Sequence, residues 1–261
     1  MDLELAGHRA LVTGASRGIG LATARRLVAE GATVVTGSRE TTPELKELVN
    51  TGHVTAVTVD LTSPTGPDEL VAAALDTGPV DILINNAGAV TPRTGGFLSV
   101  TDEQWSQSLQ LTFMVAVRVT RTLLPHLLEQ HAGSIVNTAS VNSTLPDPLV
   151  IDYSAAKAAL LSFSKALSKE VGTNGVRINT VSPGPVSTAL WLGSQGVASA
   201  ISAATGSPPD DVAKAAIQAT ATRRFTTPDE VADLIVFLAS TRCGNITGAN
   251  FVIDGGLIQT M

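Results

Sequence analysis

Two side chains that could move a proton stand four residues apart in the segment IDYSAAKAALLSFSKAL: the phenol of Tyr153 and the ammonium of Lys157. The segment has helical periodicity, and this spacing places both side chains on one helix face. A phenol ordinarily loses its proton near pH ~10, and a nearby ammonium favours the phenolate and lowers that pKa. The pair therefore suits general acid–base catalysis on a substrate oxygen, the alternative being a solvated helix face.

A glycine-rich turn near the start of the chain could bind a dinucleotide phosphate. The strand-like segment HRALVTG runs into TGASRGIG at 13–20, and LATARRLVAEGA follows with helical periodicity. Gly14, Gly18 and Gly20 allow a tight turn and a close backbone approach to a ligand. The helix N-terminus behind them offers free N–H groups and partial positive charge. Although the spacing is GxxxGxG rather than GxGxxG, the order of strand, turn and helix predicts a dinucleotide site.

The order of these motifs resembles the short-chain dehydrogenase/reductase family, over about residues 5–256. The motifs are TGASRGIG at 13–20, NNAG at 85–88, a serine at Ser140, YSAAK at 153–157, SPGPVST at 182–188 and DGG at 254–256. The resemblance implies an enzyme that transfers a hydride between NAD(P) and a ketone or secondary alcohol. It also implies that Ser140, Tyr153 and Lys157 are catalytic, with Ser140 stabilising charge on the substrate oxygen.

Further cofactor contacts follow from the same resemblance. Asp60 is expected at the adenine amino group, and Lys157 at the ribose hydroxyls of the nicotinamide half. Asn85 is expected to brace the sheet instead. The complete expected set is Gly14, Ser16, Arg17, Gly18, Ile19, Gly20, Ser38, Arg39, Asp60, Leu61, Asn86, Ala87, Gly88, Tyr153, Lys157, Pro183, Gly184, Val186 and Thr188.

The segment ATVVTGSRE, which ends the second expected strand, favours NADPH over NADH. In this fold an acid at this place holds a ribose 2′-hydroxyl, whereas an arginine suits a 2′-phosphate. Ser38 stands where an NAD-preferring relative would carry aspartate, and Arg39 follows it. Arg17 adds a second positive charge, and arginine pairs well with phosphate oxygens. We therefore expect NADP(H), with NAD(H) possible because Glu40 could reach a ribose hydroxyl.

Alternating strands and helices predict an α/β fold: a Rossmann-like, doubly wound, seven-stranded parallel sheet in the order 3-2-1-4-5-6-7, with helices on both faces. Ligands in such folds bind beyond the carboxyl ends of the strands. Strands are expected at about 9–13, 32–37, 54–59, 80–85, 133–139, 176–181 and 249–253, and helices at about 18–30, 43–50, 67–77, 102–130, 152–172 and 228–240. Because no linker interrupts the pattern, we expect one domain over 1–261, with a mobile helical substrate flap at 187–222.

One position departs from the family pattern. Relatives commonly carry an asparagine on the long central helix, seven residues after a tryptophan, where this chain has Thr112 after Trp105. The family asparagine holds a water that links the lysine to solvent, and threonine lacks its amide. Helical periodicity turns the nearest amide, Gln110, onto another face. Two functions therefore remain open: an active reductase in which Thr112 substitutes for the asparagine, and a cofactor-binding regulator or assembly subunit with little catalysis.

The composition of the chain argues against some classes of binding partner. The chain has 261 residues, 44% hydrophobic, with a net charge of -6. Scattered basic residues argue against nucleic acid, and no apolar run reaches the ~18 residues of a membrane span. With one cysteine, Cys243, and no signal peptide, we expect a cytoplasmic protein. We expect no metal site, and the resemblance implies a homotetramer.

The expected substrate is a neutral, hydrophobic carbonyl compound, because the candidate pocket segments carry few charges. These segments are 89–97, 141–151 and 187–222. Arg93 and Asp152 are the charged residues there that could face an ionic substrate. The candidate apolar lining residues are Val90, Phe97, Leu145, Leu149, Ile151, Trp191 and Leu192.

Overall fold

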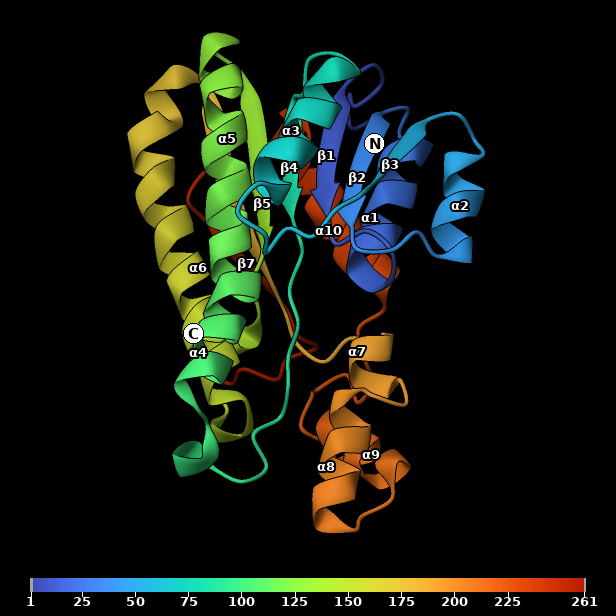
Figure 1. Cartoon of the computed structure of the whole chain (residues 1–261), viewed down its shortest axis with the longest axis vertical. Helices are drawn as coiled ribbons and strands as arrows, with labels where there is room; N and C mark the ends of the chain where they lie inside the picture. The colour runs from blue at the N-terminus through green and yellow to red at the C-terminus, as the bar shows by residue number, and fades with distance from the viewer. Residues whose placement is uncertain (1, 261) are drawn as a thin grey trace.

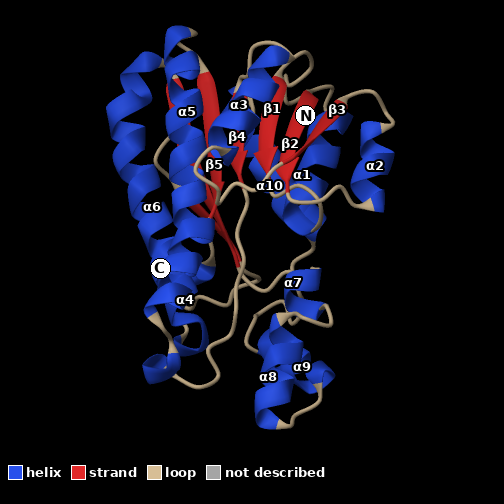
Figure 2. Cartoon of the chain, in the orientation of Figure 1, coloured by secondary structure: helices blue, strands red, loops and turns tan. Residues whose placement is uncertain are grey.

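A seven-stranded parallel sheet forms the centre of the computed structural model, which describes residues 2–260 (Figure 1 and Figure 2). Its order, β3-β2-β1-β4-β5-β6-β7, is the predicted one. The strands are β1 Arg9–Thr13, β2 Thr33–Ser38, β3 Val54–Thr58, β4 Ile82–Asn85, β5 Gly133–Thr138, β6 Val176–Pro183 and β7 Asn250–Ile253. The strands expected from the sequence are therefore present, and the central ones are buried on both faces, whereas the edge strands β3 and β7 are partly exposed.

Helices cover both faces of the sheet. On one face lie α1 (Gly18–Ala29), α2 (Pro43–Val49) and α10 (Pro228–Ala239), and on the other α3 (Gly66–Asp76), α5 (Val115–Glu129) and α6 (Ile151–Val171). Successive residues of β1 point to opposite faces, so Val12 belongs to one buried cluster and Leu11 to the other. This layering directs the carboxyl ends of all seven strands to one edge.

The long helix expected at 102–130 is not continuous. It consists of α4 (Asp102–Leu109), a π-helical turn η2 (Gln110–Met114) and α5. The wider turn shifts the phase of the side chains relative to a regular α-helix. Thr112 is consequently 1% exposed and donates a hydrogen bond from Oγ1 to the carbonyl of Ala89 at 3.3 Å.

The continuous run Asp102–Glu129 has the length and hydropathy of a helix that could cross a membrane, although no apolar stretch in the sequence suggested one. Its apolar side chains have a different partner in this fold. Val115, Val119, Leu123 and Leu127 are fully or nearly fully buried in the cluster between α5, α3 and the sheet. The hydropathy of this run is therefore explained by core packing.

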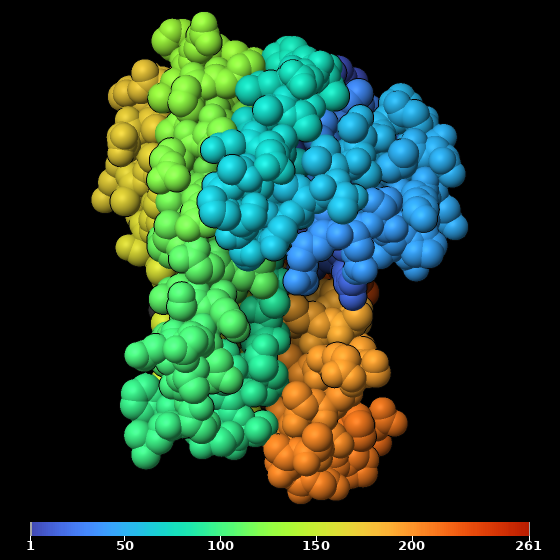
Figure 3. All heavy atoms as spheres, viewed as in Figure 1, coloured from blue at the N-terminus to red at the C-terminus, as the bar shows by residue number. Residues whose placement is uncertain are grey.

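The segment 187–222 contains three short helices, α7 (Ala189–Leu192), α8 (Val197–Thr205) and α9 (Pro209–Gln218). They form a lobe that projects beyond the sheet, opposite α4 (Figure 1 and Figure 3). The helical content agrees with the expected flap. Its mobility stays a prediction.

A buried chain of amides and hydroxyls joins the centre of the sheet to two helices. Asn85 Nδ2 donates to Asn137 Oδ1 at 2.8 Å and to Thr120 Oγ1 of α5 at 2.9 Å. Asn137 Nδ2 in turn donates to Ser164 Oγ of α6 at 2.7 Å. Asn85 therefore braces the sheet, as expected, and α6 is fixed to β5 by a side-chain hydrogen bond.

Replacing Asn137 with leucine should test this network. The substitution keeps the side-chain volume but removes one hydrogen-bond partner from the Asn85 amide, which keeps Thr120, and one from the Ser164 hydroxyl, which keeps the Leu160 carbonyl. We expect the free energy of unfolding to fall by about 2–4 kcal/mol, measured by urea denaturation followed by circular dichroism. Asn174→Leu, at an exposed asparagine, is the control and should change stability by less than about 0.5 kcal/mol. Equal stabilities for the two variants would contradict the network's role.

Candidate active site

The glycine turn packs directly against the loop that follows β4. Gly14 has a φ of +68°, and a Cβ added there would lie 2.9 Å from the Cα of Ala87. At Gly20 a Cβ would lie 2.4 Å from the Gly14 carbonyl oxygen, so helix α1 can approach the turn only with glycine. Asn86 Nδ2 closes the arrangement by donating to the carbonyls of Thr13 and Gly14 at 3.2 and 3.1 Å.

This geometry fits a dinucleotide phosphate. The backbone N–H groups in the first turn of helix α1 have no hydrogen-bond partner within the helix. They lie next to the glycine turn, where a phosphate can accept hydrogen bonds from them. Asn86, expected from the sequence as a cofactor contact, also holds the glycine turn in shape through its side chain. Ser16 is part of the same turn, and its carbonyl accepts from Thr42 Oγ1 at 2.6 Å.

The end of β2 carries the charges expected to select the cofactor. Arg39 and Glu40 are exposed. Glu40 forms a salt bridge with Arg17, which belongs to the glycine turn. Ser38 is 8% exposed and donates from Oγ to the Glu40 carbonyl at 2.8 Å, which fixes the direction of this short segment. Glu40 therefore offsets the positive charge of Arg17, one of the two arginines expected to favour NADPH.

Asp60 follows β3 at the same edge. Its Oδ1 accepts from the Thr62 N–H at 2.9 Å and from the Thr62 hydroxyl at 2.7 Å. These hydrogen bonds lower the pKa of Asp60, and the charge of Arg39 lowers it further. Asp60 is thus a fixed carboxylate, while its neighbour Leu61 is 5% exposed and belongs to the core.

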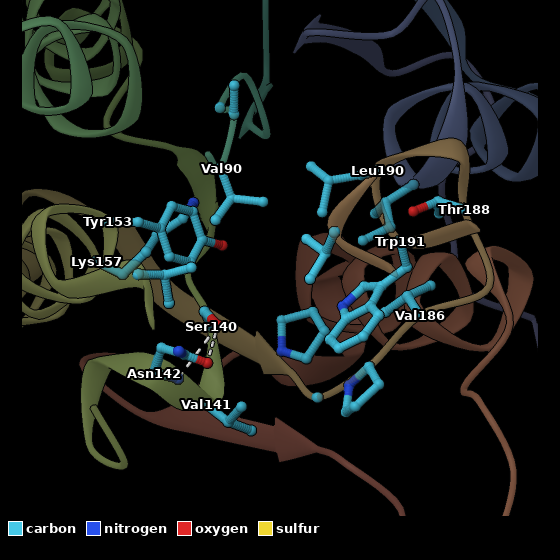
Figure 4. A pocket seen from close by; sticks show the side chains of 18 of the residues that line it. Val90, Ser140, Val141, Asn142, Tyr153, Lys157, Val186, Thr188, Leu190 and Trp191 are labelled. Atoms are coloured by element: carbon cyan, nitrogen blue, oxygen red, sulfur yellow. Dashed lines mark hydrogen bonds between the residues drawn. The ribbon is translucent and has the colours of Figure 1, made fainter. Parts of the chain in front are cut away.

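The three residues expected to be catalytic lie together at the carboxyl end of β5 and the start of α6. Ser140 caps the 3-10 turn η3 (Val141–Ser143), directly after β5. Tyr153 and Lys157 lie on one face of α6, with Lys157 Nζ 5.7 Å from the centre of the Tyr153 ring. Lys157 is 3% exposed and donates to the Thr138 carbonyl at 2.5 Å. Figure 4 shows Ser140 and Tyr153 on the same side of the pocket.

Burial, more than the neighbouring charge, controls these titrations. Removal from water raises the pKa of Tyr153 from near 10 to about 12, and the hydroxyl of Ser140 lowers it by a smaller amount. Burial also lowers the pKa of Lys157 to about 8. The expected lowering of the Tyr153 pKa by Lys157 is therefore not found: the shift is upward, and burial is its largest cause. At neutral pH the phenol is protonated and can donate its proton.

A cavity of about 430 Å³ opens in front of these groups. It brings together the majority of the predicted site residues, namely Gly14, Arg17, Gly18, Ile19, Asn86, Ala87, Gly88, Ser140, Tyr153, Lys157, Pro183, Gly184, Val186 and Thr188. Other predicted residues lie outside its lining: Ser16, Gly20, Ser38, Arg39, Asp60, Leu61 and Thr112. The cavity thus joins the glycine turn to Tyr153, as one dinucleotide extending between them would require.

Part of the expected substrate lining is wrong. Val90, Leu149 and Trp191 line the cavity, with Val90 facing Trp191 and Leu190 across it (Figure 4). Phe97, Leu145, Ile151 and Leu192 do not line it. Phe97, Leu145 and Leu192 are instead among the most exposed apolar side chains, at 61%, 46% and 48%. Single-sequence reasoning located the segments correctly but could not tell which side of each loop faces inward.

Three polar residues of the cavity lining were missed: Thr138, Asn142 and Asp147. Asn142 Oδ1 accepts a hydrogen bond from the Ser140 hydroxyl at 3.3 Å, and the backbone N–H of Asn142 donates to Ser140 Oγ at 3.2 Å (Figure 4). Asp147 also lines the cavity, and its Oδ1 accepts a hydrogen bond from the Leu149 N–H at 2.9 Å. A local signal for Asn142 existed, because serine side chains commonly bond the backbone two residues on. Leu257, from the C-terminal tail, also lines the cavity and gave no sequence signal.

Arg93 and Asp152 do not face the cavity as a pair of substrate ligands; they bind each other. Their side chains are 12% and 2% exposed, with Arg93 Nη2 2.5 Å from Asp152 Oδ2. Within residues 2–260, no group of three or more His, Cys, Asp or Glu side chains could hold a metal ion.

The fold and site define a dinucleotide-dependent oxidoreductase, and comparison with known proteins agrees. Residues 8–195 match the family model described as short chain dehydrogenase. An uncharacterized oxidoreductase of Bacillus subtilis, YvrD, is 34% identical over 100% of both chains. The 3-oxoacyl-[acyl-carrier-protein] reductase FabG of Thermotoga maritima is 32% identical, covering 98% of this chain and 100% of the relative.

Solved structures give the same assignment. L-sorbose reductase from Gluconobacter frateurii, complexed with NADPH and L-sorbose, superposes with a TM-score of 0.91 at 32% identity over 100% of both chains. The protein belongs to the short-chain dehydrogenase/reductase family and is an oxidoreductase of that family. Members of this family bind nicotinamide cofactors, which is the class of ligand expected from the glycine turn.

The state of Tyr153 can be read directly, because the chain contains a single tyrosine. Tyrosinate absorbance of the ligand-free protein should stay absent through pH 10 and rise with a midpoint near the pKa of about 12. Since the folded protein favours the protonated phenol, folding stability should be full below pH ~10 and fall as the pH rises toward that midpoint. A spectrophotometric titration, with Tyr153→Phe as the blank, checks this. A midpoint below 9 would show that Lys157, and not burial, controls the phenol.

Proposed function

We propose that the protein reduces a ketone to a secondary alcohol with NADPH, using Tyr153 as the proton donor. The supporting observation is a half-buried phenol at the cavity wall, protonated at neutral pH, beside the hydroxyl of Ser140 and the ammonium of Lys157. No structural need requires these three groups to meet at the end of a strand, whereas acid catalysis on a carbonyl oxygen does.

A bound reduced nicotinamide would supply the hydride, and the protein supplies geometry and charge. Tyr153 gives its proton to the substrate oxygen as negative charge develops on it. Ser140 donates a hydrogen bond to the same oxygen, after its hydroxyl turns away from Asn142. The Lys157 ammonium, held by the Thr138 carbonyl, stabilises the phenolate that remains. In the opposite direction the phenolate takes the proton of the alcohol.

The preference for NADPH rests on two arginines. Arg39 is exposed at the end of β2, and Arg17 lies in the glycine turn, so both can approach a 2′-phosphate. No acid occupies position 38 to hold a ribose 2′-hydroxyl. The solved L-sorbose reductase structures contain NADPH, which supports the same choice for this chain.

The proposed substrate is a small ketone with an apolar side. Val90, Leu149 and Trp191 line the cavity, and Trp191 is fixed by edge-to-face contact with Phe225 at 5.7 Å between ring centres. Asn142 and Asp147 add polar groups to the cavity lining. The relatives are named for reduction of L-sorbose and of 3-oxoacyl groups, and the family therefore accepts a range of substrates.

Replacing Tyr153 with phenylalanine removes only the proton donor. We expect turnover in NADPH-consumption assays against a panel of ketones to fall by about 10³-fold, because positioned acids contribute 10²–10⁴. NADPH affinity, measured by fluorescence titration, should stay within about twofold, since the ring and Lys157 remain. Ser140→Ala should also lose turnover, whereas Ser143→Ala, three residues on, should remain active. NADPH binding by the wild type without turnover on any ketone would favour a cofactor-binding regulator instead.

Arg39→Ala should raise the Michaelis constant for NADPH about tenfold or more and leave that for NADH nearly unchanged, because a charge-assisted bond to phosphate is lost. Glu40→Gln should act in the opposite direction, since it frees Arg17 and removes a negative charge. Steady-state kinetics with both cofactors measure the ratio. Arg25→Ala, an exposed arginine of α1, is the control. Equal effects of Arg39→Ala on the two cofactors would exclude a contact with the 2′-phosphate.

A further inference from the structure

A buried ion pair lies directly behind the proposed proton donor. Arg93, in the loop after β4, donates from Nε and Nη2 to Asp152 Oδ2 at 3.1 and 2.5 Å. Asp152 immediately precedes Tyr153 in the first turn of α6, where a carboxylate also benefits from the helix N-terminus. The second oxygen, Oδ1, is buried and has no hydrogen-bond partner among residues 2–260. Arg93 is therefore the main counter-charge of this carboxylate.

The same loop forms a wall of the substrate cavity. Ala89, Val90 and Pro92 line the cavity, and the loop continues without regular structure to the 3-10 turn η1 (Phe97–Ser99). Figure 1 shows it running from β4 across the front of the molecule toward α4. A long irregular segment of this kind holds one shape only if it is fixed at several points.

Three contacts fix it. Thr112 of the π-helical turn donates to the Ala89 carbonyl at 3.3 Å, and the Arg93 N–H donates to the Leu149 carbonyl at 2.6 Å. The Arg93 guanidinium adds the ion pair with Asp152. Two of the three contacts join the wall to the short segment 149–152, which leads into Tyr153.

Overall stability is a weak reason for such a pair. Taking two charges out of water costs about as much as their attraction returns, and apolar residues of similar size often stabilise equally well. A planar guanidinium that meets one oxygen through two nitrogens does, however, fix direction as well as distance. The pair is therefore better suited to holding a geometry than to holding the fold together.

We propose that Arg93 and Asp152 are positioning residues that set the distance between the cavity wall at Val90 and Pro92 and the hydroxyl of Tyr153. The proposal rests on the reductase function proposed above. Loss of the pair lets the wall move away from α6, so a bound ketone is held less closely against the proton donor. Cofactor binding at the glycine turn does not depend on the pair.

Asp152→Asn tests the proposal with little change of shape. We expect kcat for a ketone to fall and its KM to rise by about tenfold each, because a misplacement of 1 Å can cost 10²-fold. NADPH affinity should not change. Asp233→Asn, which removes the exposed pair between Arg26 of α1 and Asp233 of α10, is the matched control and should leave kcat and KM unchanged.

Two readouts do not require turnover and separate this proposal from the reductase function. Hydrogen exchange at the Arg93 amide, which is bonded to Leu149 in the native loop, should speed up about tenfold or more in Asp152→Asn. Tyrosinate absorbance, which reports Tyr153 alone, should appear at lower pH, because water reaches the phenol when the wall loosens. If the wild type reduces no ketone, these two measurements still decide whether the pair positions Tyr153.

A double variant separates positioning from stability. Arg93→Leu with Asp152→Leu leaves no buried unpaired charge and should regain the thermal stability lost in Asp152→Asn. If the pair positions Tyr153, the double variant does not regain the wild-type values of kcat, KM, the hydrogen-exchange rate of the Arg93 amide or the pH at which tyrosinate appears. Recovery of all four together with stability would overturn the proposal, as would an Asp152→Asn protein that matches the wild type in each of them. The double variant also serves if Asp152→Asn fails to fold.

Discussion

The partial removal of one phenol from water is the physical constraint that shapes the candidate site. A phenol with an ordinary pKa near 10 is already protonated at neutral pH, and desolvation raises the pKa of Tyr153 further, so its phenolate can form only where nearby groups stabilise the negative charge. The same low-polarity surroundings lower the pKa of Lys157, so the ammonium needs the Thr138 carbonyl to remain where it is. Burial thus favours the protonated phenol but works against the ammonium, which still predominates at neutral pH because the pKa of Lys157 falls only to about 8.

The fold provides that burial by layering. Asn137 and Ser164 join β5 to α6, so the strand that ends near Ser140 and the helix that carries Tyr153 are held together by a buried hydrogen bond. Glycine at 14 and 20 lets α1 and the loop after β4 approach closely at the other end of the cavity. Parallel strands bring these distant segments to one edge, and the site is formed where their loops meet.

Sequence patterns predicted the parts that depend on periodicity and on local chemistry. Every strand lies within two residues of its expected position at each end, because buried parallel strands are short apolar runs with clear boundaries. Tyr153 and Lys157 were singled out by their spacing on one helix face, and Ser140 by the resemblance to the family. The π-helical turn at 110–114 was not predicted, because one turn with an extra residue leaves almost no trace in the hydrophobic pattern. The cavity side of each loop and the sign of the Tyr153 pKa shift depend on tertiary burial, which no local pattern encodes.

Thr112 shows how such a tertiary effect changes an interpretation. From the sequence it was a weakened substitute for an asparagine in a proton relay. In the structure the π-helical turn buries it, and its hydroxyl donates to the Ala89 carbonyl, so it contacts the loop and not the phenol. Arg93 fixes the same loop farther along by pairing with Asp152, beside Tyr153. Because Ala89, Val90 and Pro92 between these two contacts line the cavity, the residue that departs from the family pattern and the buried ion pair act on one wall. Loop geometry thereby connects two features that are 40 residues apart in the chain, Thr112 and Asp152.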